Sequence, residues 1–200
     1  MKILEKYISS EFTVKGSRFL SELFPCTKQE DARTIIKQQK SKYSDATHVV
    51  HAFILGLSAE VMGMSDDGEP SGTAGRPALD VLKGHGSTNH VLTITRWFGG
   101  TLLGTGGLVK AYGDGAKQVL LAADQAGLFC EYIEKKDFSF CCDYQFYQVV
   151  KHLMEQFTIS DLNENFNTEI RLQGRLPLRE FQTFQNQIKN ASNGKIQIQD

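Results

Sequence analysis

The chain has 200 residues, of which 40% are hydrophobic and 22% are charged, as is ordinary for a soluble globular protein. This length allows one or two domains. The formal net charge is −1, so charge gives no overall case for a nucleic-acid or membrane partner. No stretch approaches the roughly 20 apolar residues that a membrane helix needs, and the N-terminus lacks the apolar core of a signal peptide. We therefore expect a cytoplasmic protein.

The first half of the chain predicts strands that alternate with helices. Extended structure is expected over 10–25, with an interruption near Gly16. A helix follows, because Thr27 and Glu30 have the spacing of a capping box. The next segment, "ATHVVHAFIL" at 46–55, is apolar almost throughout and predicts a strand inside a sheet rather than at its edge.

The middle of the chain carries a polar loop, a helix, a strand and a cluster of glycines. "SDDGEPSG" at 65–72 has the composition of a loop. Pro77 suits the first turn of a helix and Gly84 suits its end. "HVLTITRWF" at 90–98 predicts a strand, and a long helix follows the glycines.

The last third of the chain has the order β-α-β-β-α-β, which is typical of a ferredoxin-like domain. Phe138, Phe140 and Cys142 alternate as in a strand, so Cys141 and Cys142 point to opposite faces. Pro177 opens a helix, and "KIQIQ" at 195–199 alternates as a last strand. We predict two α+β domains, 1–135 and 138–200.

Three carboxylates gather in the polar loop, at Asp66, Asp67 and Glu69. Carboxylates at this density can hold Mg²⁺. They can also lock the loop by accepting bonds from backbone amides or from an arginine, for which Arg76 and Arg96 are the nearest candidates. Contact with a partner is a third reading. Both charge signs are unevenly distributed: residues 1–42 carry nine Lys and Arg against five Asp and Glu, and residues 60–69 carry four acids and no base.

The glycines at 99–107 precede a helix, whose first amides are unpaired and lie at the positive end of its dipole. Glycine permits positive φ and close approach of the backbone, so this turn suits an anion. The spacing is neither that of a Walker loop nor that of a dinucleotide fingerprint. The alternative is a tight strand-to-helix connection that packs closely on its sheet. His48 and His51 lie three positions apart on a strand and therefore on opposite faces, which argues against a metal pair.

Four segments carry a resemblance to a known family: "KGSRF" at 15–19, "ATHVVHAF" at 46–53, "SDDGEPSGTAGRP" at 65–77 and "RWFGGTLLGTGGLVKAY" at 96–112. They resemble the YigZ/IMPACT family. The resemblance implies a first domain similar to domain four of elongation factor G, a fold shared with a ribosomal protein, and a second similar to the domain that follows it. Eukaryotic members regulate translation initiation, and the resemblance supplies no catalytic residues.

We therefore expect a non-enzymatic binding protein that contacts the ribosome, RNA or a translation-related protein, without a cofactor or a metal. The alternatives are a metal- or phosphate-dependent enzyme that uses the loop at 65–76 and the turn at 99–107, and an interaction module regulated by a small molecule. The candidate partner- or anion-binding residues are Asp66, Asp67, Glu69, Ser71, Arg76, Arg96, Gly99, Gly100, Gly104, Gly106, Gly107 and Lys110.

Overall fold

The computed structural model describes residues 1–198. The chain divides into two compact units, Met1–Tyr132 and a second that begins at Ile133. Both units combine helices with β-sheets, and every strand pair is antiparallel except β1 with β6 among residues 1–198. The predicted two-domain α+β fold is therefore confirmed.

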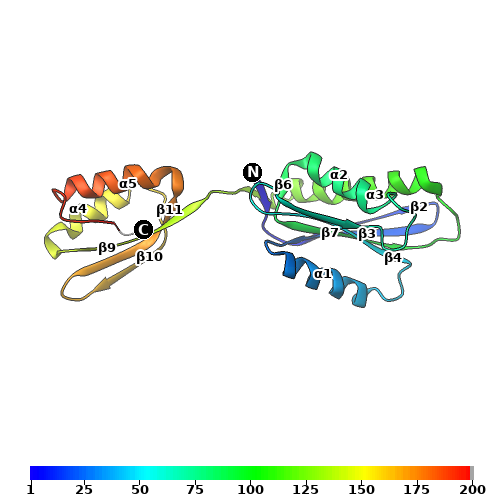
Figure 1. Ribbon diagram of the computed structural model, residues 1–200, viewed down its shortest axis with the longest axis horizontal. Helices are drawn as coiled ribbons and strands as arrows, with labels where there is room; N and C mark the ends of the chain where they lie inside the picture. Colours follow the sequence, from blue (N-terminus) through cyan, green and yellow to red (C-terminus); the bar gives the residue numbers. More distant parts are fainter. Residues whose placement is uncertain (199–200) are drawn as a thin grey trace. The chain divides into compact units, whose positions relative to one another are not determined.

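A five-stranded antiparallel sheet with the order β2-β3-β7-β4-β5 organises the N-terminal unit. Helix α1 lies against one face of this sheet, and α2 and α3 cover the other (Figure 1). The segment at 48–55 is an inner strand, as predicted, because it pairs on both sides. The elements are β2 (Ile8–Val14), β3 (Ser17–Pro25), α1 (Gln29–Lys42), β4 (His48–Leu55), β5 (Val61–Ser65), α2 (Gly75–His85), β7 (His90–Trp97) and α3 (Gly104–Gln125).

The main core of this unit fills the space between the sheet and the helices α2 and α3. Phe19, Leu92 and Tyr112 are fully buried there. A second sheet of three short strands, with the order β6-β1-β8, completes the unit. Its strands are β1 (Lys2–Leu4), β6 (Ser87–Thr88) and β8 (Phe129–Glu131).

Two predicted helix ends differ from the structure. Helix α1 begins at Gln29 with Lys28 as N-cap and has no side-chain capping bond, so the predicted capping box is wrong. Helix α2 ends one residue beyond Gly84, and Gly86 is the glycine that takes the left-handed conformation, with φ of 74°. Gly84 has no positive φ, so it is not the residue that ends the helix.

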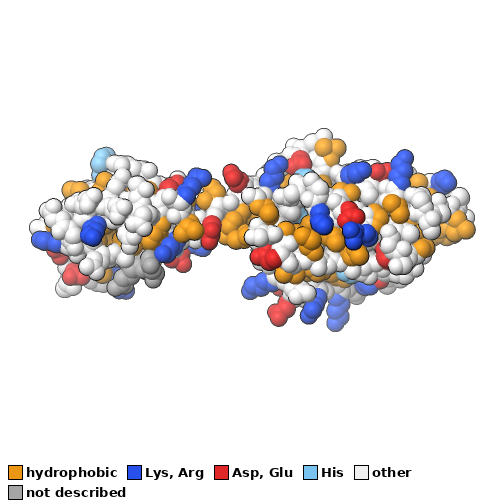
Figure 2. Space-filling view, turned by 45° about the horizontal axis from the view of Figure 1, so that its top comes forward, with side chains coloured by type: hydrophobic (Ala, Val, Ile, Leu, Met, Phe, Trp, Pro, Cys, Tyr) orange, Lys and Arg blue, Asp and Glu red, His pale blue; other side chains and the backbone are white. Residues whose placement is uncertain are grey.

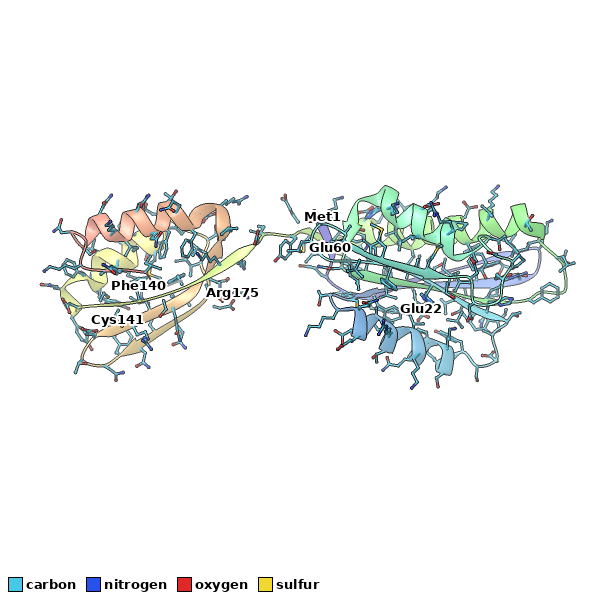
Figure 3. The ribbon with its side chains drawn as sticks, viewed as in Figure 1. Met1, Glu22, Glu60, Phe140, Cys141 and Arg175 are labelled. Atoms are coloured by element: carbon cyan, nitrogen blue, oxygen red, sulfur yellow. The ribbon has the colours of Figure 1, made fainter. Side chains whose placement is uncertain are left out.

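The second unit contains a three-stranded antiparallel sheet with the order β10-β11-β9. One face packs on the helices and the other is open: Phe140 points toward the helices and Cys141 away from them (Figure 3). Cys142 is buried and Cys141 exposed, so the predicted alternation is confirmed. The elements are β9 (Lys135–Cys142), α4 (Tyr144–Met154), β10 (Ser160–Phe166), β11 (Ile170–Pro177) and α5 (Leu178–Ala191).

The predicted last strand at 195–199 is not formed over its described part. Residues 195–198 have no ladder, and Gln199 lies outside the described residues. The predicted alternation of buried and exposed residues is nevertheless present. Ile196 and Ile198 are 4% and 8% exposed and pack in the hydrophobic core of the second unit.

Candidate functional site

The candidate site is a pocket of the N-terminal unit with a volume of about 440 Å³. Three separate segments contribute to it: the acidic loop, the β4–β7 strand pair and the glycine-rich turn with the start of α3. We call it the loop–turn pocket. Its lining residues are Thr47, His48, Gly68, Glu69, Pro70, Arg96, Phe98, Leu102, Leu103, Gly104, Thr105 and Leu108.

The buried carboxylate of Glu69 forms part of the pocket lining. Oε1 of Glu69 accepts bonds from Nη1 of Arg96 and from the hydroxyl of Tyr112, both at 2.7 Å. Oε2 lies 3.7 Å from Nε2 of His48. Burial, followed by the bond to Glu69, raises the pKa of Tyr112 well above its usual range, so this phenol remains a donor. The arrangement stabilises a charge pair inside the protein rather than presenting a free base.

Arg96 also links this pair to the glycine-rich turn. Its Nη2 donates to Oγ of Ser17 at 3.3 Å, and the backbone amide of Gly99 donates to the same oxygen at 3.2 Å. Gly99 packs directly on Gly16, since a Cβ at Gly99 would lie 1.8 Å from the Gly16 carbonyl carbon. Close packing of the turn therefore explains Gly99 without any ligand.

Asp66 locks the loop onto the start of α2. Its carboxylate accepts the backbone amides of Gly72 at 2.8 Å, Ala74 at 3.1 Å and Gly75 at 2.8 Å. Burial acts to raise the pKa of Asp66, but these bonds outweigh it and the pKa is lowered. The first amides of α2 are thus occupied by the protein's own carboxylate and are not available to an outside anion.

Asp67 fixes the loop to the sheet. Its Oδ2 accepts the backbone amide of Val49 at 2.6 Å, and its Oδ1 pairs with Lys40. The backbone carbonyl of Asp67 lies 2.8 Å from Nδ1 of His48. A carbonyl only accepts, so Nδ1 carries the proton and Nε2 is directed toward Glu69.

All three carboxylates of the loop therefore have partners within the protein, which is the loop-locking reading of the acidic run. Arg96 supplies the predicted arginine contact. Arg76 does not: its Nε pairs with Asp80 on the same helix at 3.0 Å. Over residues 1–198, no group of three or more His, Cys, Asp or Glu is placed to hold a metal ion.

The start of α3 differs from that of α2, because within residues 1–198 no side chain accepts a bond from its first amides as Asp66 does at α2. Gly104, Thr105 and Gly106 are exposed, and a Cβ at either glycine would meet nothing within 4 Å. Gly104 has φ of 72°, which favours glycine, but Gly106 has no positive φ. A glycine inside a helix lowers stability by about 0.5–1 kcal/mol relative to alanine. Neither the backbone conformation nor the space around Gly106 requires a glycine at this position. We call Gly104–Gly106 the bare turn.

The structure brings only part of the predicted set together. Glu69, Arg96 and Gly104 line the pocket, and Asp66 and Asp67 hold the loop that supplies Glu69. Ser71, Arg76 and Lys110 are exposed and lie outside the lining. Of the remaining glycines, Gly100 has φ of 86° and a Cβ at Gly107 would lie 3.2 Å from that of Leu103, so each has a local structural reason.

Sequence reasoning missed three contributors to the site. His48 was weighed only as a metal ligand, yet it lies directly across from Arg96 on the neighbouring strand and therefore on the same face. Phe98 and Leu102 are 46% and 82% exposed at the mouth of the pocket. The sequence shows only that these apolar residues flank a glycine-rich turn, and their exposure is visible in the structure alone.

The fold and site define a two-domain protein whose first unit carries an Impact N-terminal domain: the model of that domain matches residues 15–120, and a model described as a domain of unknown function, DUF1949, matches residues 141–195. The chain belongs to the IMPACT family. It is 34% identical over 191 residues to an IMPACT family member of Haemophilus influenzae, covering 94% of this chain and 91% of that protein. YigZ of Escherichia coli is 32% identical, covering 92% and 90%, and YvyE of Bacillus subtilis is 30% identical, covering 95% and 86%.

A solved structure supports the same architecture over nearly the whole chain. A crystal structure described as that of a hypothetical protein is similar with a TM-score of 0.68 and 30% identity, covering 98% of this chain and 95% of that one. Among the helices over residues 1–198, none combines the length and the apolar character needed to cross a membrane.

Proposed function

We propose that the protein is a non-enzymatic, cytoplasmic binding protein that associates with RNA during translation and that the bare turn of α3 receives a phosphate. The observation that carries this proposal is the exposed, uncapped start of α3. Unpaired amides and the positive end of the helix dipole favour an anion there, and the two glycines on either side of Thr105 permit close approach.

The pocket beside the bare turn suits a base that is attached to that phosphate. Phe98 and Leu102 expose apolar surface at its mouth. Stacking of a base on an aromatic side chain contributes about 1–3 kcal/mol and tolerates any sequence. Arg96, the cation that lines the pocket, is already paired with Glu69 and is not available to further phosphates. The pocket therefore suits one nucleotide of a single strand rather than a long run of phosphates.

Surface charge supports the same preference. Lys and Arg side chains are scattered over the face formed by α2 and α3, with Asp and Glu side chains among them (Figure 2). A protein that tracks a polyanion by charge alone has a continuous basic stripe. Recognition by amides and stacking at one place is the better match to this surface.

An enzymatic role has less support. The carboxylates that could act as bases or metal ligands are bonded to amides, to Arg96, to Lys40 or to Tyr112. Ser17, whose hydroxyl contacts Arg96, is fully buried and accepts two bonds. The role in translation rests on the family and on the resemblance of the first unit to a domain of an elongation factor.

Binding of single-stranded RNA and co-sedimentation with ribosomes, each at a low and a high salt concentration, test the proposal. Phosphate contacts predict that raising the salt weakens binding. Gly106→Ala should weaken binding several-fold, because its methyl group obstructs the bare turn. Gly84→Ala is the matched control: Gly84 is an exposed helical glycine of α2 whose added Cβ also meets nothing within 4 Å.

Both substitutions should raise helix stability by about 0.5–1 kcal/mol, so a loss of binding in one alone is not a folding effect. No association at low salt, or equal binding by the two variants, would contradict the proposal. Binding that does not respond to salt would remove the phosphate contact.

A further inference from the structure

Strand β5 forms one edge of the five-stranded sheet and pairs only with β4 in it. Its sequence, VMGMS, contains neither a charged residue nor proline. Pairing with β4 is continuous from His51 opposite Ser65 to Leu55 opposite Val61, with no bulge. Proteins usually protect an exposed edge with a charge, a proline or a bulge, and β5 has none of these.

The same edge exposes apolar side chains. Val61, Met62 and Met64 are 36%, 42% and 44% exposed. Met62 and Met64 lie opposite Ile54 and Ala52 of β4, which are buried in the main core. An added strand would therefore continue the apolar surface of the core outward. Methionine adapts its shape to different neighbours, which suits a surface that accepts varied side chains.

We infer that the edge of β5 is a docking site for an extended, basic segment of a protein partner, which adds to the sheet as a further strand. Backbone hydrogen bonds to the free edge supply binding, and alternate side chains of the segment pack beside Met62 and Met64. This site is separate from the loop–turn pocket and does not depend on the proposed RNA contact.

Charge selects the kind of segment. Glu60 precedes β5 and Asp66 follows it. Asp67 and Glu69 are already paired with Lys40 and Arg96, so the negative charge at this edge comes from Glu60 and Asp66. Glu60 is exposed and is labelled in Figure 3. Lysine or arginine at both ends of the incoming segment would lie near these two residues, which flank the ends of the strand, and opposite charges on neighbouring strands stabilise pairing. The same negative charge disfavours RNA at this edge.

A second copy of the chain fits less well. Two β5 strands paired antiparallel about Gly63 would bring Glu60 of each copy near Asp66 of the other, just beyond the ends of the strands, because 60 and 66 lie equally far from 63. Like charges brought together across two strands destabilise the pair. The edge is thus suited to a different chain that carries positive charge.

A synthetic peptide of the sequence Lys-Thr-Ile-Thr-Ile-Thr-Lys, capped at both ends, is the probe. Its symmetric pattern sets lysines near Glu60 and Asp66, and isoleucines near the methionines, in either strand direction. Two further versions carry N-methyl groups on one or the other set of alternate amides. Only one set faces the edge, so one version should bind to the full-length protein and the other should not, as measured by shifts of the β5 amide signals in NMR spectra.

Replacing both lysines of the peptide by glutamate should weaken binding by about tenfold at low salt. The double variant Met62→Lys, Met64→Lys should abolish binding of the lysine peptide. Leu57→Lys is the control, since Leu57 is 39% exposed next to the strand but outside it. A melting curve for each variant separates loss of the site from loss of the fold.

Equal behaviour of the two N-methylated peptides, whether both bind or neither does, overturns the inference. So does unchanged binding by the double Met variant. A dimer that forms without peptide and is lost in that variant would show that a second copy, not a basic segment, occupies the edge.

Discussion

Replacing Arg96 by methionine should strongly destabilise the N-terminal unit. Arg96 and Glu69 are 5% and 7% exposed, and Nη1 and Oε1 are 2.7 Å apart. Methionine fills much of the volume but removes the charge, so the Glu69 carboxylate remains buried with only Tyr112 and His48 near it. Breaking a buried pair from one side costs about 3–5 kcal/mol. A domain is typically stable by only about 5–15 kcal/mol, so the effect should be large.

A double-variant cycle isolates the interaction. Adding Glu69→Gln to Arg96→Met removes the stranded charge, and the double variant should therefore cost less than the sum of the two single variants. Coupling between contacting residues is typically about 0.5–3 kcal/mol. We expect the upper part of that range here, because both partners are nearly inaccessible to water.

The chain itself supplies the reporter for this measurement. Trp97 is the single tryptophan and lies at the end of β7 in the N-terminal unit. Urea unfolding followed by its fluorescence therefore reports that unit alone. Arg76→Met is the control, because the Arg76–Asp80 pair has side chains that are 59% and 51% exposed and such surface pairs contribute about 1 kcal/mol or less. Equal costs for the two arginine variants would refute the role of the buried network.

Three further predictions follow from single positions. Gly99→Ala should lower the melting temperature of the N-terminal unit markedly, because the new Cβ would lie 1.8 Å from backbone atoms, whereas Gly106→Ala should raise stability by about 0.5–1 kcal/mol; a similar response of both would contradict the packing argument. Burial, and then the charge of a neighbouring histidine, lower the pKa of His90 from 6.5 to about 4. The unfolded chain binds this proton more readily, so stability is full above pH 6.5 and falls as the pH drops toward 4; His90→Gln should remove that part of the slope in a series of urea titrations. A thiol reagent should modify exposed Cys141 in the native protein much faster than buried Cys142, whose pKa burial raises; equal rates by mass spectrometry would mean that β9 does not hold the described register.

Much of the local structure could be predicted from the sequence. The alternation of Phe138, Phe140 and Cys142 predicted the inner face of β9, and the run at 46–55 predicted an inner strand of the first sheet. Side-chain direction along a strand depends only on the parity of the position, so a short segment contains the information. The loop character of 65–72 followed in the same way from its own residues.

The ends of elements were harder, because they depend on what packs beyond them. Thr27 and Glu30 have capping-box spacing, yet α1 begins at Gln29 without a side-chain cap. The segment "KIQIQ" alternates like a strand, but over 195–198 its isoleucines pack into the second core without pairing. The same pattern of burial arises with or without a hydrogen-bonded neighbour, and a sequence shows only the pattern.

The sequence by itself determined which segments are helices, strands or loops and that a glycine-rich turn precedes a helix. It also offered locking of the loop by its own carboxylates as one interpretation among several. All of these depend on residues within a few positions of each other. Only the tertiary structure decided that Arg96, and not Arg76, meets Glu69, a contact between residues 27 positions apart. It also decided which helix start is available: Asp66 occupies the first amides of α2, while those of α3 have no side-chain cap. Both outcomes depend on which distant segments the sheet brings together, and the free energy of that pairing is not a property of any one segment.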